Sequence, residues 1–281
     1  MTPRRILDSH VHFIEASRFS YPWMREAPSL RRRFDPSDYR EATLDLPVTD
    51  LVFIECTAEF GQSLDEVDWV LGLQSEEPRL KRIVARAPLT DRERRGPVLE
   101  ALRTRPGVVG IRDIIQWEPR GYCSQPAYIE GVKLASELGF HLELCIFHPQ
   151  LPDVLELVRA CPGVRFVLNH CGKPGIAQGA MEPWASELRE LSRFENVSCK
   201  ISALLTEASA KWRPEDFPPY TDHVIECFGH ERIMYGGDWP VVTLAGSYKD
   251  WFEVTRLITR GFSEEALDRY YYENARAFYG L

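Results

Sequence analysis

The chain has 281 residues, of which 44% are hydrophobic, which is enough for one large α/β barrel or for two ordinary domains. Its formal net charge of -8 leaves no positive surface of the kind that binds nucleic acid or an anionic membrane. No segment is long and apolar enough to predict a membrane span, and no apolar region of a signal peptide follows Arg4 and Arg5. A small molecule is therefore the expected partner.

The seven cysteines are odd in number, scattered along the chain and mostly set in apolar segments such as Leu144-Cys145-Ile146. This usage is typical of reduced cysteines in a protein core rather than of a disulfide framework. We therefore expect a cytoplasmic protein. The sequence leaves open whether the chain assembles into a homo-oligomer.

The first candidate site residues are the two histidines of the stretch 6–12. Side chains alternate along a β-strand, so His10 and His12 share one face of a strand, whereas they would diverge on a helix. Two apolar residues followed by Asp-Ser-His-Val-His fit a buried strand that turns polar at its C-terminal end. Taken alone, the pair is more typical of two surface histidines, so the rest of the chain decides.

Beyond an irregular stretch at 13–36, predicted strands and helices alternate. The strands are expected at 51–55, 82–85, 107–113, 140–147, 164–168, 197–201 and 233–235. The helices are expected at 63–73, 96–102, 126–138, 151–160, 182–191, 219–228, 247–258 and 264–272. Eight mostly apolar strands predict a parallel sheet buried on both faces, most economically a closed (β/α)₈ barrel. A doubly wound open sheet is the alternative, but the turn after the first strand lacks its glycine-rich pattern.

In a parallel barrel the C-terminal ends of the strands meet at one mouth. His10 and His12 follow the first strand, His170 follows the sixth, and Asp238 follows the eighth. Three imidazoles and a carboxylate suit a divalent transition metal, and imidazole favours zinc over magnesium or calcium. The sequence therefore predicts one site at this mouth.

Four stretches carry these residues in a family-like order. They are Leu7-Asp8-Ser9-His10-Val11-His12-Phe13, Leu168-Asn169-His170-Cys171-Gly172-Lys173-Pro174, Cys199-Lys200-Ile201-Ser202 and Met234-Tyr235-Gly236-Gly237-Asp238-Trp239-Pro240-Val241. They resemble the signatures of the amidohydrolase superfamily and, more narrowly, of its lactonase branch, which includes L-fuconolactonases, L-rhamnonolactonases and a pyrone-dicarboxylate lactonase. The resemblance implies a distorted (β/α)₈ TIM barrel over residues 1–281 as a single domain. It also implies hydrolysis of a cyclic ester at His10, His12, His170 and Asp238.

The chain departs from the usual sugar-lactonase pattern at four positions, Asn169, Cys171, Ala203 and Gly237, none of which removes a proposed ligand or base. Arg112 stands near the end of the fourth strand, where many members of the superfamily carry a modified lysine that bridges two metals. The resemblance therefore implies at most one divalent metal, with zinc the choice that the histidines favour. Some members of the lactonase branch work without any metal, so metal-free catalysis stays open.

Asp238 is the candidate general base, which would take a proton from the attacking water and raise the rate by about 10²–10⁴-fold. A zinc ion at His10 and His12 would polarise the ester carbonyl. His170 is either a third ligand or a hydrogen-bond donor to the developing oxyanion. The alternative for His170 is a histidine whose hydrogen bonds are satisfied within the core.

Five further residues are candidates for contact with substrate: Trp23, Arg112, Gln116, Glu143 and Lys200. The planar fork of Arg112 could grip a hydroxyl or carboxylate, although a salt bridge at the barrel rim fits it nearly as well. Glu143 could instead neutralise Arg112 or Lys200, and Lys200 could simply fill the polar layer of the barrel. A tryptophan is more often used for packing than for recognition.

The leading functional hypothesis is a hydrolase that opens a lactone, with a sugar-acid lactone as the expected small-molecule substrate. Its first rival is a decarboxylase or hydratase that acts on an aromatic or unsaturated carboxylic acid on the same scaffold. Its second rival is a non-catalytic sugar-binding barrel, for which three histidines and an aspartate would be unneeded.

Overall fold

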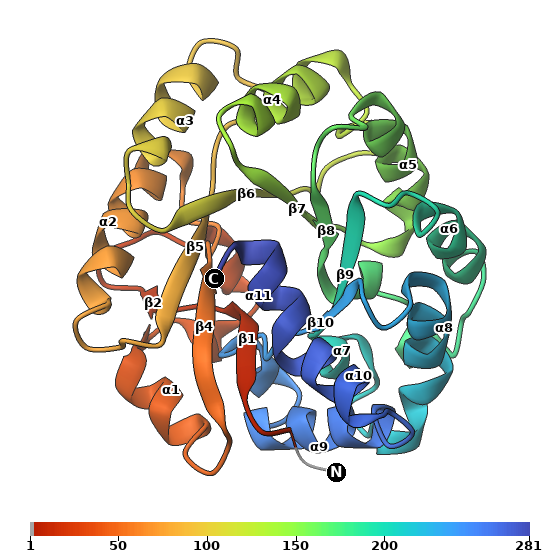
Figure 1. The fold of residues 1–281 in the computed structure, drawn as a ribbon. Helices are drawn as coiled ribbons and strands as arrows, with labels where there is room; N and C mark the ends of the chain where they lie inside the picture. The colour runs from red at the N-terminus through yellow and green to blue at the C-terminus, as the bar shows by residue number, and fades with distance from the viewer. Residues whose placement is uncertain (1–2) are drawn as a thin grey trace.

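The computed structural model describes residues 3–281, and its central feature is a sheet of eight parallel strands (Figure 1). The strands are β1 (Ile6–Val11), β4 (Val48–Ile54), β5 (Leu80–Ala85), β6 (Val108–Ile114), β7 (His141–Cys145), β8 (Phe166–Leu168), β9 (Val197–Ile201) and β10 (Ile233–Tyr235). Each pairs with its neighbour in the order β1-β4-β5-β6-β7-β8-β9-β10. All eight strands predicted from the sequence are confirmed.

The sheet closes on itself between the segment after β10 and the end of β1. The backbone amide of His12 donates to the carbonyl of Trp239 at 2.7 Å, and the amide of Asp238 donates to the carbonyl of His10 at 2.8 Å. A single parallel bridge joins Val11 to Trp239. The predicted (β/α)₈ TIM barrel is therefore confirmed, with a closure that is sparser than the pairing between the other strands.

Helices surround the barrel and cover its outer face (Figure 1). Those that follow a strand are α2 (Ser63–Leu73), α3 (Arg95–Arg103), α4 (Pro126–Glu137), α5 (Leu151–Ala160), α6 (Trp184–Leu191), α8 (Pro218–Phe228) and α9 (Tyr248–Ile258). Gly139, with φ of +94°, lies just beyond α4, where a glycine adopts at little cost the backbone conformation that ends a helix. None of the helices in residues 3–281 combines the length and apolar character needed to cross a membrane.

The stretch predicted as irregular between 13 and 36 is mostly loop, with two short additions. β2 (Ile14–Glu15) and β3 (Arg33–Phe34) form a small antiparallel pair, and 3₁₀ turns lie between them. The helix α1 (Pro36–Ala42) follows, and the sequence analysis did not predict it. Asp35 starts α1 because its carboxylate accepts from the amides of the first turn while Asp38 closes the capping box.

Apolar side chains form two cores, one on each face of the sheet. The larger core lies between the strands and the surrounding helices. The smaller core fills the inside of the barrel, where Leu7, Val52, Val84, Val167 and Met234 meet. A barrel filled in this way is a packed layer rather than a channel, so the site at its mouth has a rigid floor.

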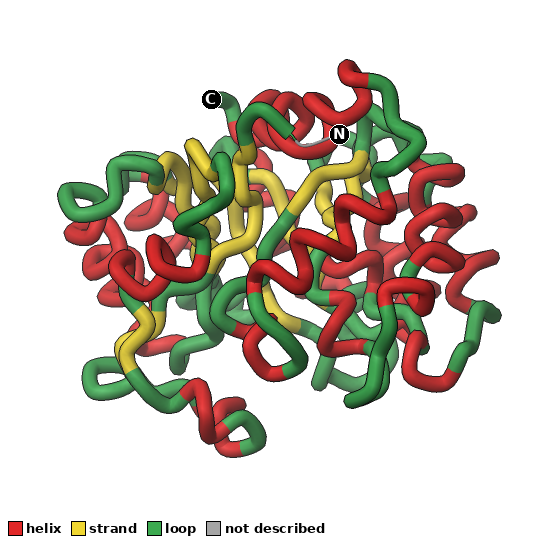
Figure 2. The backbone as a smooth tube through the Cα atoms, turned by 90° about the horizontal axis from the view of Figure 1, so that it is seen from below, coloured by secondary structure: helices red, strands yellow, loops and turns green. Residues whose placement is uncertain are grey.

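The C-terminal segment closes the barrel at the end where the strands begin. The predicted helix over 264–272 is divided into α10 (Glu264–Asp268) and a π-helical turn, and α11 (Asn274–Tyr279) follows, which the sequence analysis missed. Figure 1 shows α11 in front of the strands, and Figure 2 shows both termini on the same side of the molecule. The hydroxyl of Tyr279 enters the barrel and donates to Oε1 of Glu143 at 2.6 Å.

We predict that Tyr279→Phe lowers the free energy of unfolding by about 1–3 kcal/mol, because it leaves a buried carboxylate without one of its donors. Tyr272→Phe is the matched control, since it also removes one hydroxyl, which donates to the partly buried Asp50 at 3.0 Å. Tyr272→Phe should lower the free energy of unfolding by less than Tyr279→Phe does. Urea unfolding of both variants measures the difference, and equal losses would contradict the special role of Tyr279.

Candidate active site

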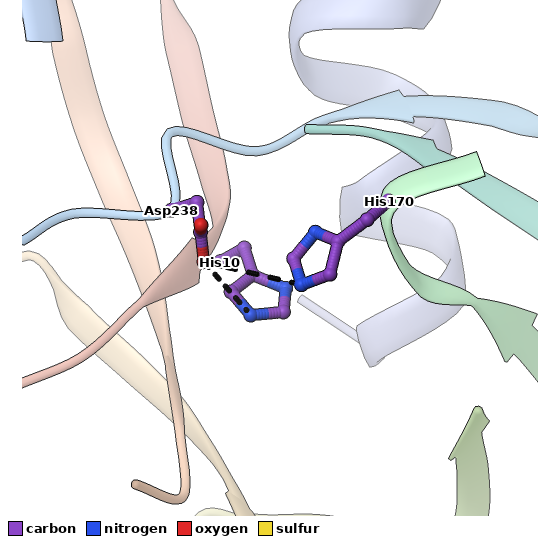
Figure 3. Close-up of side chains that lie close together, drawn as sticks. All are labelled: His10, His170 and Asp238. Carbon is purple, nitrogen blue, oxygen red and sulfur yellow. Dashed lines mark ion pairs between the residues drawn. The ribbon is translucent and has the colours of Figure 1, made fainter. Parts of the chain in front are cut away.

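Four polar side chains converge where β1, β8 and β10 end. His10 lies in β1, His12 directly follows it, His170 lies in the turn after β8, and Asp238 lies in the turn after β10. Oδ1 of Asp238 lies 3.4 Å from Nε2 of His12, 3.5 Å from Nε2 of His10 and 4.0 Å from Nε2 of His170. Figure 3 shows His10, His170 and Asp238 pointing toward one another. The structure thus brings together the four residues that the sequence analysis grouped.

The backbone is strained around this point. Six residues other than glycine have positive φ among those described, and five of them line the same pocket: Thr57, His170, Lys173, Ala203 and Asp238. A left-handed conformation costs a residue with a β-carbon about 1–2 kcal/mol. Strain of this kind gathers at functional sites because the surrounding structure must hold each side chain in a specific direction.

Two of the histidines are held neutral, and the third is held in a fixed orientation. Burial together with the Lys200 ammonium keeps the pKa of His10 well below its usual range, and burial together with the Lys173 ammonium does the same for the pKa of His170. Nδ1 of His12 lies 2.8 Å from the carbonyl of Ile54. Because a carbonyl only accepts, Nδ1 of His12 carries a proton, and this contact fixes the ring with Nε2 toward Asp238.

The donor atoms of His10, His170 and Asp238 fit a single divalent ion, and His12 is not part of this group. In a tetrahedral zinc site with bonds of about 2.0–2.1 Å, neighbouring donors lie roughly 3.4 Å apart, close to the separations around Asp238. Donor atoms of His10, His170 and Asp238 lie within 4.8 Å of one another, the one such group found in the described part of the chain. Nη1 of Arg112 also lies 3.2 Å from Nε2 of His10 and competes for its lone pair. An ion bound to His10 must displace that contact.

Asp8 ties the two sides of the barrel closure together. Its buried carboxylate accepts from the amide of His10 at 3.0 Å and from the amide of Gly237 at 2.7 Å. The hydroxyls of Tyr39 and Tyr248 donate to its other oxygen at 2.9 and 2.8 Å. Burial raises the pKa of Asp8, while these four bonds oppose the rise. Asp8 therefore positions both the histidine strand and the turn that carries Asp238.

Gly237 is required by this packing. A β-carbon added there would lie 2.3 Å from the ring of Tyr248 and 2.5 Å from Oδ2 of Asp8. The departure from the sugar-lactonase pattern at Gly237 is thus explained by close packing behind the turn. Ala203, another of the four departures from that pattern, has φ of +58° and carries the strain of the left-handed conformation itself.

A layer of buried charges lies beneath the four site residues. Nε of Arg112 donates to Oε1 of Glu55 at 2.7 Å, and Nζ of Lys200 donates to Oε2 of Glu143 at 2.6 Å. The amide of Asn169 links the two pairs, because its Nδ2 donates to Glu143 at 2.8 Å and its Oδ1 accepts from Arg112 at 3.5 Å. Each buried charge therefore has a partner, as burial in a low dielectric requires.

Ionisation in this layer follows from burial and pairing. Burial lowers the pKa of Lys200 to about 8, although Glu143 opposes this shift. Burial also disfavours the charged form of Glu143, but Lys200 and His141 outweigh it and keep the pKa of Glu143 well below its usual range. Nζ of Lys200 also lies 3.5 Å from Nδ1 of His10. The charge of this layer therefore contributes to the lowered pKa of His10.

Above the site residues lies a pocket of about 410 Å³. The predicted residues that line it are His12, Trp23, Arg112, Gln116, His170 and Asp238. His10 is fully buried and does not line the pocket. The indole of Trp23 donates to the carbonyl of Cys56 at 2.8 Å, so Trp23 offers the pocket its ring face. Gln116 accepts from Lys173 at 2.7 Å.

Glu143 and Lys200 do not line the pocket. They are 1% and 0% exposed, and each is the other's partner. Both lie one layer down in the barrel and neutralise each other, which is the alternative that the sequence left open for each. Direct contact of these two residues with substrate stays a prediction.

Sequence reasoning missed four residues that shape the site. Glu55 holds Arg112, although its place at the end of an apolar strand was a usable signal. Asp8 was quoted only as part of a motif. Lys173 and Glu207 line the pocket and lie 3.7 Å apart. No periodicity marks these last two, because Lys173 lies in the turn after β8 and Glu207 ends the four-residue helix α7 (Leu204–Glu207) after β9.

A closed parallel barrel with a His-x-His pair, a third histidine and a late aspartate at its mouth defines an enzyme that works at the carboxyl ends of its strands. The model of the family described as Amidohydrolase matches residues 7–281. The chain belongs to this amidohydrolase family, and the resemblance predicted from the four motifs is confirmed.

Named relatives match over nearly the whole barrel. The L-fucono-1,5-lactonase of Burkholderia multivorans is 30% identical over 274 residues, which cover 90% of this chain and 87% of that protein. The L-rhamnono-gamma-lactonase of Scheffersomyces stipitis is 22% identical, with 100% of both chains covered. A crystal structure of an amidohydrolase from Burkholderia multivorans with bound zinc has a TM-score of 0.87 at 26% identity, over 98% of this chain and 99% of that one.

We expect the purified protein to hold at most about one divalent ion per chain, since the described residues contain one group of suitable donors. His170→Gln should lower the ion content, as measured by elemental analysis. His223→Gln is the matched control, because that histidine bonds to the carbonyl of Ala185 away from the site. Two tightly held ions per chain would contradict the prediction. Activity that survives chelation would indicate that the histidines act as hydrogen-bonding groups.

Proposed function

We propose that the protein hydrolyses a lactone and that the ring of a sugar-acid lactone enters the pocket above Asp238. The observation that carries the proposal is a carboxylate that faces three histidines at the base of a pocket open to solvent. Such a carboxylate can hold and deprotonate a water molecule. The two lactonase relatives supply the reaction class.

The reaction opens the ring in two steps. In the first, Asp238 takes a proton from water while the water oxygen bonds to the ester carbonyl carbon, and the carbonyl oxygen becomes an oxyanion. In the second, the bond between that carbon and the ring oxygen breaks, and Asp238 returns its proton to the ring oxygen. The product is an open-chain hydroxy acid. Asp238 thus acts first as base and then as acid at the same carboxylate.

The other site residues hold the reacting groups in place. A zinc ion, when bound by His10, His170 and Asp238, would keep one position open and would supply Lewis-acid polarisation of the carbonyl. Ser202 fixes the ring of His170 through Nδ1, at 2.8 Å. That contact aims the Nε2 atom of His170 at the pocket, where it can meet the carbonyl oxygen.

Polar residues at the rim can bind the hydroxyl groups of a sugar ring. The Lys173 ammonium has three N–H donors. It donates one to Gln116 and lies 3.7 Å from Glu207 as an ion-pair partner. A further N–H can donate to substrate. Glu207 accepts hydrogen bonds on its free oxygen, so Lys173 and Glu207 together offer a donor and an acceptor to neighbouring hydroxyls.

We predict that Asp238→Asn lowers kcat for lactone hydrolysis by at least about 10²-fold, while KM changes far less. Asn matches Asp in size but cannot take a proton, so the chemical step should suffer and the fold should not. Glu207→Gln is the matched comparison, because it neutralises another carboxylate of the same pocket that lies away from the histidines. It should affect KM more than kcat.

A panel assay tests the proposal and its rivals together. Proton release is measured with L-fucono-1,5-lactone and L-rhamnono-gamma-lactone, the substrates named for the two relatives. Carbon dioxide release from aromatic acids is measured in parallel. Carbon dioxide release without lactone opening would favour the decarboxylase. Wild-type turnover by Asp238→Asn would show that Asp238 is not the base.

A further inference from the structure

The catalytic pocket continues into a second cavity, which we call the outer lobe. Trp23, Glu26, Thr57 and Trp117 line both cavities. The outer lobe has a volume of about 430 Å³, comparable to the 410 Å³ of the catalytic pocket. A lactone whose carbonyl reaches Asp238 therefore has adjoining space for another part of the same molecule.

The rim of the catalytic pocket is unusually apolar for a protein surface. Four large hydrophobic side chains are exposed among the described residues, and three of them, Trp117, Phe147 and Leu244, line this pocket. Trp117 is 53% exposed and stands at the boundary with the outer lobe. Exposed apolar side chains that gather at one site, rather than singly, mark a surface that a ligand covers.

The walls of the outer lobe suit a flat, uncharged group. The indole nitrogen of Trp23 is already bonded to a backbone carbonyl, so this wall offers ring surface only. The guanidinium of Arg86 lies 3.7 Å from the centre of the Phe60 ring and presents a second flat surface. Nε of Arg86 lies 3.9 Å from the Asp113 carboxylate, and Glu26 and Glu59 add two further negative charges to the lining of the lobe. An anionic substituent would therefore gain little there.

We propose that the outer lobe binds a neutral aryl substituent on the lactone, so that the physiological substrate is an aryl-substituted lactone rather than a bare ring. The inference rests on the proposed function. The lactone ring occupies the catalytic pocket, and the aryl group lies against Trp117 and Trp23. Selection for the substituent then comes from apolar contact, in which even one methylene group changes kcat/KM by about 10–200-fold.

The test compares two lactones that differ only in the substituent, δ-hexalactone with a methyl group and δ-phenyl-δ-valerolactone with a phenyl group. We expect the wild-type protein to prefer the phenyl lactone by at least about tenfold in kcat/KM. Trp117→Ala should reduce that preference by a similar factor. Leu44→Ala is the matched control, because Leu44 is 80% exposed and lines neither cavity. It should leave the preference unchanged.

Two results would overturn the inference. One is equal kcat/KM for both lactones in the wild type. The other is a change in solution mass on Trp117→Ala with the preference retained, which would assign the apolar rim to contact between copies of the chain.

A second experiment tests binding in the outer lobe independently of catalysis. It measures, by calorimetry, the affinity of the protein for the two ring-opened hydroxy acids. A preference for the phenyl acid without any lactone hydrolysis would reject the proposed function and support the lobe. Hydrolysis of lactones with equal binding of the two acids would support the proposed function and reject the lobe.

Discussion

The barrel closes between its first and last strands, and the site depends on how that closure is made. β10 has only three residues, and a single bridge joins its following segment to β1. The Asp8 carboxylate joins the two sides of the closure, because it accepts hydrogen bonds from a backbone amide on each side. Those two amides belong to His10 and to the residue before Asp238. This buried side chain and the two backbone hydrogen bonds of the closure therefore set the distance between the histidine pair and the carboxylate that faces it.

The layer of paired charges below the site connects the site to the opposite end of the barrel. Tyr279 donates to Glu143 from the end where the strands begin, Glu143 holds Lys200, and Lys200 approaches His10. Removing any one partner would leave a charge buried without compensation, which costs more than the pair contributes when intact. The floor of the site is therefore rigid because its electrostatics allow few other arrangements. Chemistry that needs fixed geometry gains from such a floor.

The sequence predicted the barrel and the four converging residues because both follow from periodicity. Continuously apolar strands indicate a sheet that is buried on both faces, and a parallel barrel brings the polar C-terminal ends of its strands to one mouth. Depth within the barrel is not encoded in the same way. Glu143 and Lys200 share the polar character of pocket residues, and only the stacking of layers shows that they lie below the floor. The α11 segment was missed because a short helix after a π-helical turn has no clear period of its own.

Two of the four departures from the sugar-lactonase pattern lie in the floor of the site, whereas Ala203 lines the pocket. Asn169 joins the two buried ion pairs, and Gly237 makes room for Tyr248 and Asp8. Both differences are explained by packing within the floor, so neither bears on which lactone is bound. Differences in substrate must then come from the loops that carry Trp23, Trp117 and their neighbours. Loops tolerate substitution without disturbing the strands, which lets one catalytic floor serve lactones with different substituents.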